Sequence, residues 1–429
     1  MKKILVRGPA LSRSGYGEQT RFALRSLREH QERFDIYLIN LNWGQTSWVW
    51  EDNEERTWID ELIKKTIIYM ESFRQKQINP HFDISLQVTI PNEWEKLAPI
   101  NIGYTAGIET TKIAPQWIEK ANLMDKIIVV SNHAKEVFEN TTHTVEQNGQ
   151  RIESFKCHSP IEVVNYAVRE SEPVDIGFDL DYDFNFLTVA QISPRKYLDK
   201  TVEWFVEEFI DREVGLVVKC NIANDSLMDR WHTQLRLQNL LSKYENRKCK
   251  IYLIHGSMKE EEIASLYKHP KIKAYVTTTH GEGFGLPMFE AAYNDLPIVA
   301  ANWSGYLDFL YAPVKDKKTK KETMKAHFAK VRYQLKPIEP EAVWDGVLQE
   351  DSMWCYPDQG SFKMKIRELY RDYDRYKKQA KKLNKYIRKT FTEEAMYGKF
   401  ANAVFKEEEH DIQEWLDNME ICFCCRFFC

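Results

Sequence analysis

The chain has 429 residues, enough for two or three ordinary domains, and is 43% hydrophobic and 29% charged. This balance is typical of a soluble globular protein with large cores. The 60 basic residues are offset by 64 acidic ones, for a formal net charge of -4. There is therefore no global basic excess of the kind that binds nucleic acid regardless of sequence. No apolar run approaches the ~20 residues that a membrane-spanning helix needs.

The first segment, MKKILVRGPA, has only three apolar residues before Arg7 and predicts a strand rather than the core of a secretory signal. We therefore expect a cytoplasmic protein. Short apolar runs then alternate with longer amphipathic stretches. In the first half of the chain the predicted strands are 3–8, 34–42, 83–88, 100–107, 126–132 and 161–168. The predicted helices between them include 17–31 and 55–75.

The same alternation returns after residues 170–183, where Pro, Asp and Gly predict a linker. The strands predicted here are 184–192, 214–221, 250–256, 272–279 and 296–302. The predicted helices are 197–209, 226–244, 259–269, 286–294, 361–390 and 392–410. We interpret the lysine-rich stretch 314–325 as a solvated loop. This order is typical of α/β architecture with parallel sheets, which bind ligands at the carboxyl ends of their strands.

We therefore divide the chain into an N-terminal domain, residues 1–172, and a C-terminal domain, residues 173–390. The tail 411–429 is rich in Cys and Phe, and its cysteines are Cys422, Cys424, Cys425 and Cys429. A disulfide framework is not expected in a long intracellular chain. The cysteines could bind a soft metal, although their spacing matches no zinc pattern and the cluster lacks histidine. The alternatives are a lipidated or membrane-touching tail and an unstructured end.

The segment TTHGEGFGLPMFEAAYNDLP, 278–297, places three glycines within five positions between a predicted strand and helix. Glycines let a ligand approach the backbone, and the N–H groups at a helix start favour an anion. A diphosphate is therefore the expected ligand. The spacing fits neither a Walker loop nor a dinucleotide fingerprint. Glu290 would lie one turn inside the helix and bind a ribose diol, while Glu282 would face the group on the phosphate. The alternative is a structural loop with two surface glutamates.

The stretch HGEGFGLPMFEAAYNDLPIVAAN closely resembles the signature of retaining glycosyltransferases of family 4, in which two glutamates separated by seven residues flank Gly-Phe-Gly-Leu-Pro. Further similar segments are 13–21, 103–138, 255–279 and 353–370, so the likeness spans roughly residues 1–405. The resemblance implies the GT-B fold, with two Rossmann-like domains facing across a central cleft. The acceptor would bind mainly to the first domain and the nucleotide sugar to the second. Residues 391–410 would form a helix that crosses back to the first domain.

The resemblance also implies roles for individual residues. The residues expected to bind the donor are Gly15, Tyr16, Gly17, Lys219, Gly283, Phe284, Gly285, Leu286 and Glu290. Glu282, Lys196 and Arg195 are the expected catalytic residues, with Glu282 orienting a sugar hydroxyl. Glu109 and His133 are candidates for the acceptor side.

One position departs from the family pattern, which usually pairs an arginine with a lysine five residues later to clamp the donor diphosphate. In VAQISPRKYLDK the lysine matches Lys196, but the arginine position holds Gln191. Arg195 could supply the missing charge from a shifted angle, and whether it does stays open. Without the resemblance, the run Pro-Arg-Lys could equally be a solvated loop.

Two Asp-x-Asp pairs, in 179–183 and 372–374, fall in the linker and in a charged helix, and we interpret both as solvated faces. The resemblance implies metal-independent chemistry with no cofactor, in which a helix dipole and basic side chains stabilise the leaving group. The sequence shows no second, closely spaced carboxylate for double displacement, which favours front-face attack. His280 and His255 are candidate donor contacts, and neither is expected to transfer a proton.

We therefore expect a retaining glycosyltransferase that moves a sugar from a nucleotide diphosphate sugar to a glycan, lipid-linked or other hydroxyl acceptor. The alternatives are a glycosyltransferase acting on a modified nucleobase in DNA, a sugar-phosphate epimerase or phosphorylase, and a non-catalytic nucleotide-sugar-binding protein. The basic run 375–389 could contact nucleic acid or the inner face of a membrane. We prefer to interpret it as the charged face of an ordinary helix.

Overall fold

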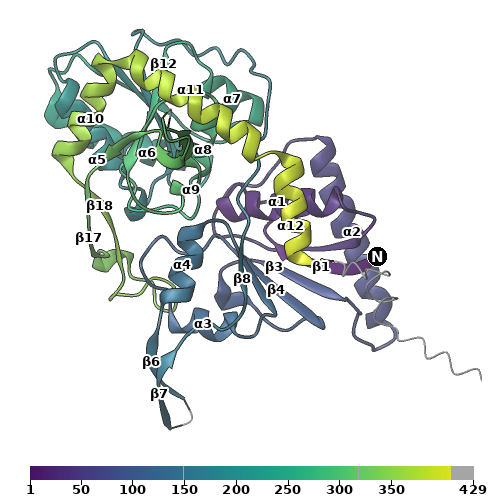
Figure 1. Cartoon of the computed structure of the whole chain (residues 1–429). Coiled ribbons are helices and arrows are strands. Elements are labelled where there is room, and N and C mark those ends of the chain that lie inside the picture. Colours follow the sequence, from purple (N-terminus) through teal and green to yellow (C-terminus); the bar gives the residue numbers. More distant parts are fainter. Residues whose placement is uncertain (148, 317, 407–429) are drawn as a thin grey trace, which may run out of the picture.

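The computed structural model describes residues 1–147, 149–316 and 318–406. Each half of the chain forms one six-stranded parallel sheet covered by helices, and the two halves lie one above the other in Figure 1. The α/β class predicted from the sequence is confirmed. None of the helices in the described ranges is long and apolar enough to cross a membrane. The cysteine tail and residues 407–410 of the predicted last helix lie outside the described residues.

The N-terminal sheet has the strand order β2-β1-β3-β4-β5-β8. Its strands are β1 (Lys2–Gly8), β2 (Phe34–Asn40), β3 (Ile84–Val88), β4 (Ile100–Thr105), β5 (Lys126–Val129) and β8 (Ile161–Val163). Its helices are α1 (Gly15–Arg28), α2 (Glu54–Arg74), α3 (Pro115–Ala121) and α4 (Asn132–Asn140). The last strand ends five residues earlier than predicted because the chain leaves the sheet, and the Val168 amide donates to the Phe391 carbonyl at 2.8 Å.

The C-terminal sheet has the order β11-β10-β9-β12-β13-β16. Its strands are β9 (Asn185–Gln191), β10 (Gly215–Asn221), β11 (Lys250–Ile254), β12 (Ile272–Val276), β13 (Ile298–Ala301) and β16 (Ala329–Val331). The helices are α5 (Leu198–Phe209), α6 (Leu227–Leu241), α7 (Glu260–Tyr267), α8 (Leu286–Tyr293), α9 (Leu307–Leu310), α10 (Gln359–Arg371) and α11 (Tyr373–Thr390). The single helix predicted over 361–390 is broken at Asp372, whose φ of -124° and ψ of 49° are not helical.

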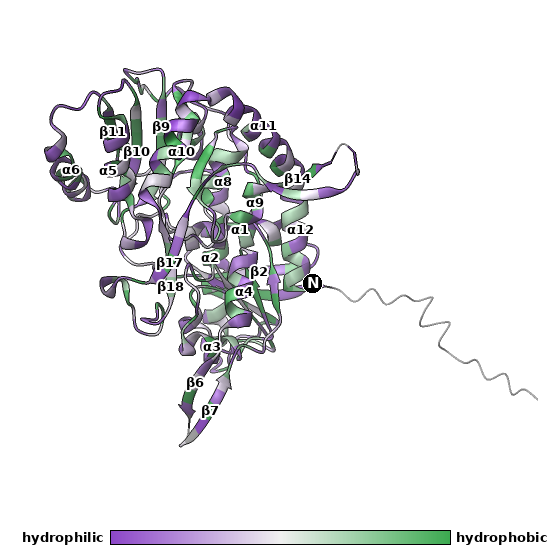
Figure 2. Cartoon of the chain, turned by 60° about the vertical axis from the view of Figure 1, so that its left-hand side comes forward, coloured by the Kyte–Doolittle hydropathy of each residue, from purple (hydrophilic) through white to green (hydrophobic). Residues whose placement is uncertain are grey.

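Three antiparallel hairpins were not predicted. They are β6 (His143–Gln147) with β7 (Gln150–Phe155), β14 (Tyr311–Lys315) with β15 (Glu322–Ala326), and β17 (Tyr333–Pro337) with β18 (Met353–Pro357). The interpretation of 314–325 as a loop was therefore wrong for 314–315 and 322–325, which belong to these strands. The β6–β7 and β14–β15 hairpins project from the body of the protein (Figure 2). Such strands lack the apolar alternation that reveals a strand packed on a core.

The basic run 375–389 forms the solvent face of α11. Its buried residues are spaced at helical intervals, at Tyr376, Ala380, Leu383 and Ile387. The lysines between them are mostly exposed. This is the arrangement of an ordinary amphipathic helix, as preferred from the sequence.

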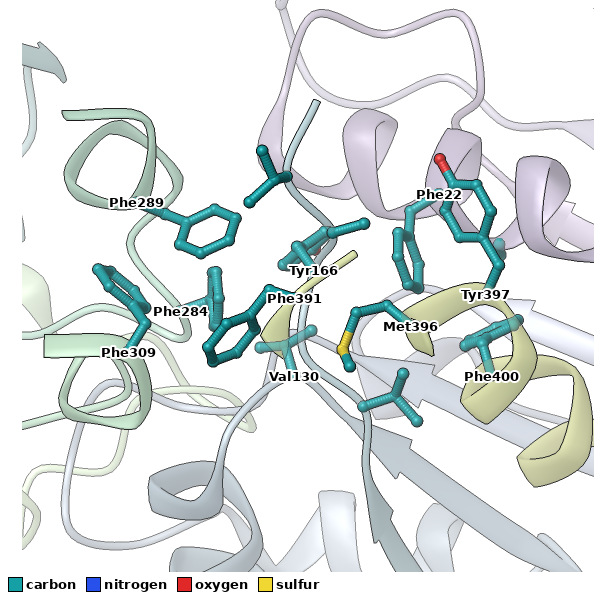
Figure 3. Close-up of a cluster of buried hydrophobic side chains, with 14 of the residues drawn as sticks. Phe22, Val130, Tyr166, Phe284, Phe289, Phe309, Phe391, Met396, Tyr397 and Phe400 are labelled. Carbon is teal, nitrogen blue, oxygen red and sulfur yellow. The ribbon is translucent and has the colours of Figure 1, made fainter. Parts of the chain in front are cut away.

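The chain crosses back to the N-terminal domain through α12 (Glu393–Val404), which lies beside α1 in Figure 1. The Phe22 and Phe400 ring centroids are 5.5 Å apart. Figure 3 shows aromatic side chains from both domains in one continuous cluster, where the Tyr166 ring lies 5.2 Å from that of Phe284. This apolar contact fixes the second domain against the first.

Residues 338–352, between β17 and β18, form an arm that reaches from the C-terminal domain to the N-terminal one (Figure 1). The Asn92 side-chain amide donates to the Gly346 carbonyl at 2.9 Å, and the Thr111 amide donates to the Met353 carbonyl at 2.9 Å. Val347 is 7% exposed and packs in an apolar cluster of the N-terminal domain. The two domains are thus joined at this arm as well as at α12.

Candidate active site

A cavity of about 1300 Å³ lies between the two domains. The N-terminal domain contributes the loop 13–16 to its lining, and the C-terminal domain contributes the strand ends 189–191 and Lys219 together with the turn 282–287. These segments follow the carboxyl ends of parallel strands, where ligands of open α/β sheets bind. The cavity is therefore the candidate active site.

The glycine turn brings the backbones of the two domains close together. A Cβ atom on Gly283 would lie 2.5 Å from the Ala106 carbonyl oxygen, so this position cannot carry a side chain without movement. Gly285 has a φ of +93° and precedes α8, and no side chain caps this helix. The first N–H groups of α8 therefore have no side-chain acceptor and are suited to an anion. Phe284, in contrast, turns its ring into the aromatic cluster between the domains.

The N-terminal glycine loop forms the start of α1. The Ser14 hydroxyl accepts a hydrogen bond from the Gly17 amide at 3.0 Å and caps the helix. A Cβ on Gly15 would meet nothing within 4 Å, whereas one on Gly17 would lie 1.9 Å from the Ser12 carbonyl oxygen. Gly15 and Tyr16 line the cavity and Gly17 does not. Gly17 thus allows the close packing of the loop, and Gly15 leaves space for a ligand.

Glu282 lies in a cluster of cations on the cavity wall. Its carboxylate is 2.6 Å from the Lys196 Nζ and 3.1 Å from the Arg195 guanidinium. Burial opposes its ionisation, but Lys196 and Arg195 outweigh that effect and lower the pKa of Glu282. Burial, with Arg195 beside it, lowers the pKa of Lys196. The carboxylate is therefore ionised and holds two cations at the cavity wall.

Glu109, from the N-terminal domain, forms an ion pair with the same guanidinium, and its carboxylate is 3.2 Å from Arg195. Arg195 therefore joins a carboxylate of each domain. The sequence shows no second carboxylate closely spaced with Glu282, and the structure brings Glu109 to the same guanidinium through a different nitrogen. The signal was absent because the two glutamates are 173 positions apart in the chain.

Gln191 and Arg195 both line the cavity. The Gln191 side-chain amide donates to the Ile222 carbonyl at 2.9 Å. Arg195 instead lies on the short turn Pro194–Lys196 and donates to the Gly281 carbonyl at 2.6 Å. Arg195 and Lys196 thus place two positive charges beside the glycine turn, although the usual arginine position holds a neutral residue.

Glu290 and Lys219 lie further along the same wall. Burial raises the pKa of Glu290 to about 7, with Glu18 and Glu260 adding to the effect and Tyr267 and Lys219 opposing it. Burial also lowers the pKa of Lys219. Glu290 lies on α8, one turn after its start, as the sequence predicted for a carboxylate that would contact a ribose.

Residues 175–318 match the family model described as glycosyl transferases group 1. The match includes the glycine turn with Glu282 and Glu290, and it includes Arg195 and Lys196. This segment is a group 1 glycosyltransferase domain. The chain is accordingly an enzyme that transfers a sugar from a nucleotide sugar, and the cavity lies where this domain meets the N-terminal one.

The fold of this glycosyltransferase is shared with solved structures. Sucrose-phosphate synthase from Thermosynechococcus elongatus has a TM-score of 0.59 at 11% identity, with 94% of this chain and 98% of that chain covered. A glycosyltransferase from Rickettsia africae has a TM-score of 0.58 at 12% identity, covering 94% and 99%. Anabaena HepE, solved with UDP and glucose, has a TM-score of 0.54 at 12% identity, also covering 94% and 99%. These likenesses establish the GT-B fold. None of the curated protein sequences matches the chain.

The three histidines considered in this glycosyltransferase are structural in their contacts. His280 is fully buried, stacks on Trp354 with ring centroids 4.7 Å apart, and shares a hydrogen bond with the Cys355 carbonyl. Burial lowers its pKa to about 4. His255 bonds to Asp229 at 2.8 Å. His133 packs edge-on against Trp303, 4.8 Å away, and does not line the cavity. His133 thus lies outside the cavity lining, and its acceptor-side role stays a prediction.

Two residues that the sequence did not single out hold Glu282 in place. The Ser304 hydroxyl accepts from the Glu282 amide at 2.7 Å and donates to the Glu282 carbonyl at 2.6 Å. The Thr279 hydroxyl donates to the Glu282 carboxylate at 3.1 Å. Ser304 has a φ of +89°, an unusual value for a residue with a side chain. The only sign in the sequence is a Ser-Gly pair, which is too common to identify such a clamp.

The Asp-x-Asp pairs lie away from the cavity lining. Asp179 pairs with Lys271 at 3.2 Å and Asp181 with Lys250 at 2.9 Å, both at the surface. Asp372 pairs with Arg375 at 2.6 Å. Their partners are cations of the protein itself, which is the arrangement of a solvated surface.

Proposed function

We propose that this glycosyltransferase is a retaining enzyme of the family 4 type, which needs neither a metal ion nor a cofactor and uses a nucleotide diphosphate sugar as its donor. The observation that carries the proposal is the cluster of Arg195, Lys196 and Glu282 beside the start of α8. Two cations and a helix start offer positive partners for a diphosphate, and an ionised glutamate offers an acceptor for a sugar hydroxyl.

In this proposal the diphosphate lies between Gly15 on one side and Lys196 with the first amides of α8 on the other. The cavity is bounded by these groups. Glu290 accepts hydrogen bonds from the ribose, and Lys219 lies near it. The sugar then reaches Glu282, which orients one of its hydroxyls. Binding of the diphosphate would draw Lys196 and Arg195 from Glu282 and Glu109, because a phosphate competes with a carboxylate for the same cations.

The reaction follows from where charge develops. The bond between the anomeric carbon and the phosphate oxygen breaks, and its electron pair stays on that oxygen. The acceptor oxygen bonds to the anomeric carbon from the same face, and its proton passes to the departing phosphate oxygen. Lys196, Arg195 and the α8 amides stabilise the charge that forms on the phosphate, so the protein lowers the barrier without forming a covalent bond.

A variant of Glu109 tests front-face attack, because the alternative route needs a carboxylate that acts as a nucleophile. Arg195 binds Glu109 at 3.2 Å, and we expect Glu109 to position this arginine for the donor rather than to attack the sugar. Glu109→Gln should then lower the transfer rate without abolishing it. Trapping of a glycosylated peptide containing Glu109 by mass spectrometry would contradict front-face attack.

The proposal is tested by incubating the protein with UDP-, GDP- and TDP-sugars and following sugar release by mass spectrometry, with and without a chelator. We expect one donor to be consumed, an unchanged rate with the chelator, and a product whose anomeric coupling in NMR matches that of the donor. Glu282→Ala should abolish turnover while circular dichroism shows that the fold is retained. Glu341→Ala, at an exposed position outside the cavity, is the control. Wild-type turnover in Glu282→Ala, or inversion of the product, would refute the proposal.

A further inference from the structure

Three tryptophans occur within eight residues in the loop between β2 and α2, at Trp43, Trp48 and Trp50. Trp48 is 50% exposed and Trp50 is 61% exposed, and Trp43 is half-buried. Large aromatic side chains normally dominate cores and interfaces, because their burial is favourable. The chemistry proposed above for the donor uses none of the three.

The loop is held firmly against the N-terminal glycine loop. The Arg13 amide donates to the Ser47 carbonyl at 2.8 Å, and the Val49 amide donates to the Leu11 carbonyl at 2.8 Å. Arg13 also forms an ion pair with Glu51. The tryptophans therefore belong to an anchored loop, whose position is set before any ligand binds.

Trp43 and Trp48 differ in what they face. Trp43 lines the cavity and packs against the tilted ring of Tyr16, with ring centroids 4.5 Å apart and an interplanar angle of 39°. The Tyr16 hydroxyl is within 2.7 Å of the Thr105 hydroxyl, which fixes the ring behind Trp43. Trp48 does not line the cavity. Trp43 and Tyr16 thus form a rigid aromatic wall on the N-terminal side, where Glu109 also lies.

The charges near this wall suit a neutral ligand with hydroxyl groups. The arginines here are already paired, Arg13 with Glu51 and both Arg21 and Arg25 with Glu18. A phosphate of a nucleic acid or a phospholipid would have to displace these carboxylates without the uncapped helix start of the donor side, because the Ser14 hydroxyl caps α1. Hydroxyl groups, in contrast, can donate to carboxylates and amide oxygens along the same wall.

We propose that Trp43, supported by Tyr16, is a stacking platform for a saccharide acceptor. A sugar ring has an apolar face of C–H bonds, which fits an aromatic ring, and an edge of hydroxyls, which fits the polar neighbours. The cavity, at about 1300 Å³, exceeds the usual 300–1,000 Å³ of a ligand pocket, so it has room for an acceptor beside the donor. This inference rests on the proposed function and names its acceptor class.

The test is saturation-transfer NMR with the full chain, UDP, and methyl glucoside, methyl galactoside, methyl mannoside and N-acetylglucosamine as probes. We expect ring C–H signals from at least one saccharide in the wild type and in Trp48→Ala. Trp43→Ala should weaken saccharide binding at least ten-fold, and Trp43→Phe should retain part of it. UDP affinity, measured by calorimetry, should change less than two-fold in all three variants, and equal melting temperatures exclude misfolding.

Each other result has a defined meaning. If no saccharide gives a signal while UDP binds, or if Trp43→Ala binds the saccharide like the wild type, the platform proposal is wrong and the proposed function stands. If Trp43→Ala weakens UDP instead, the platform serves the donor base. Binding of a short DNA strand or of glycerol phosphate that depends on Trp43 would contradict the saccharide assignment. Failure of UDP, GDP and TDP to bind the wild type would refute the proposed function, and with it this inference.

Discussion

The Lys196 ammonium lies 2.6 Å from the Glu282 carboxylate, and both side chains are placed on the wall of the interdomain cavity. Arg195 binds the same carboxylate and also reaches Glu109 of the other domain. The cations expected to bind a diphosphate are therefore balanced by carboxylates in the absence of donor. Such pairing keeps buried charges compensated until a phosphate replaces the carboxylates.

Lys196→Ala should weaken UDP binding about ten- to a hundred-fold, because a charge-assisted hydrogen bond to a phosphate contributes about 1.5–3 kcal/mol. Lys196→Arg should keep part of the affinity. Lys200→Ala, which removes a lysine paired with Glu203 outside the cavity, is the matched control and should bind UDP normally. Calorimetric titration measures all four proteins. Equal affinities for wild type and Lys196→Ala would show that this lysine does not contact the donor.

Nucleotide affinity should rise with pH through about 7, because Glu290 has a pKa of about 7 and accepts ribose hydrogen bonds best when ionised. Glu290→Gln should bind more weakly at pH 8 and lose this pH dependence. The check is a titration with UDP between pH 5.5 and 8.5 in both proteins. A pH profile that is the same in Glu290→Gln would assign the dependence to another group.

The same raised pKa makes a prediction about stability. Folding raises the pKa of Glu290 above its ordinary 4.5. The stability that its protonated form contributes to the fold is therefore fully present below pH 4.5 and is lost as the pH rises through about 7. Glu290→Gln should therefore raise the melting temperature of the ligand-free protein more at pH 8 than at pH 5. A thermal melt at each pH measures the difference, and an equal shift at both values would count against the raised pKa.

The two glycines of the N-terminal loop should respond differently to alanine. Gly15→Ala adds a methyl group in open space at the cavity, so it should keep the melting temperature and weaken UDP binding. Gly17→Ala forces a carbon to within 1.9 Å of the Ser12 carbonyl, so it should lower the melting temperature as well. Melting curves and titrations of the two variants make the comparison. If Gly15→Ala binds UDP normally, the donor does not approach this loop.

The arm between β17 and β18 should contribute to stability through Val347. Val347→Ala removes two methyl groups from a packed position and should cost about 1–2 kcal/mol of unfolding free energy. Val343→Ala, on the same arm but 38% exposed, should change it by less than about 0.5 kcal/mol. Urea denaturation of both variants gives the values. Equal losses would mean that the arm does not dock through Val347.

The parts of this structure that the sequence revealed are those with local signals. Apolar runs located the six main strands of the first domain, and three glycines with Pro287 located the start of α8. The seven residues between the two glutamates predicted that Glu282 lies on the turn and Glu290 on the helix. These patterns depend on neighbouring residues, so a single sequence is enough to find them.

The features that were missed depend on contacts between distant residues. Val347 packs in the other domain, and Glu109 meets Glu282 through Arg195, although no local pattern links these positions. Apart from Ala312, most residues of the β14–β15 strands are partly or fully exposed, so the strands do not show the alternation of a buried face. His133 was a candidate for the acceptor side, and its ring packs edge-on against Trp303 of the second domain, outside the cavity lining. Tertiary packing decides each of these cases.

The central claim is that the cavity binds both phosphates of a nucleotide sugar, and calorimetric titration with paired nucleotides tests it most directly. The protein is titrated with UDP, GDP and TDP and with the matching monophosphates. For the preferred base, we predict that the diphosphate binds at least ten-fold more tightly than the monophosphate, and that Lys196→Ala removes most of this difference. Equal affinity of the diphosphate and the monophosphate in the wild type would contradict the account.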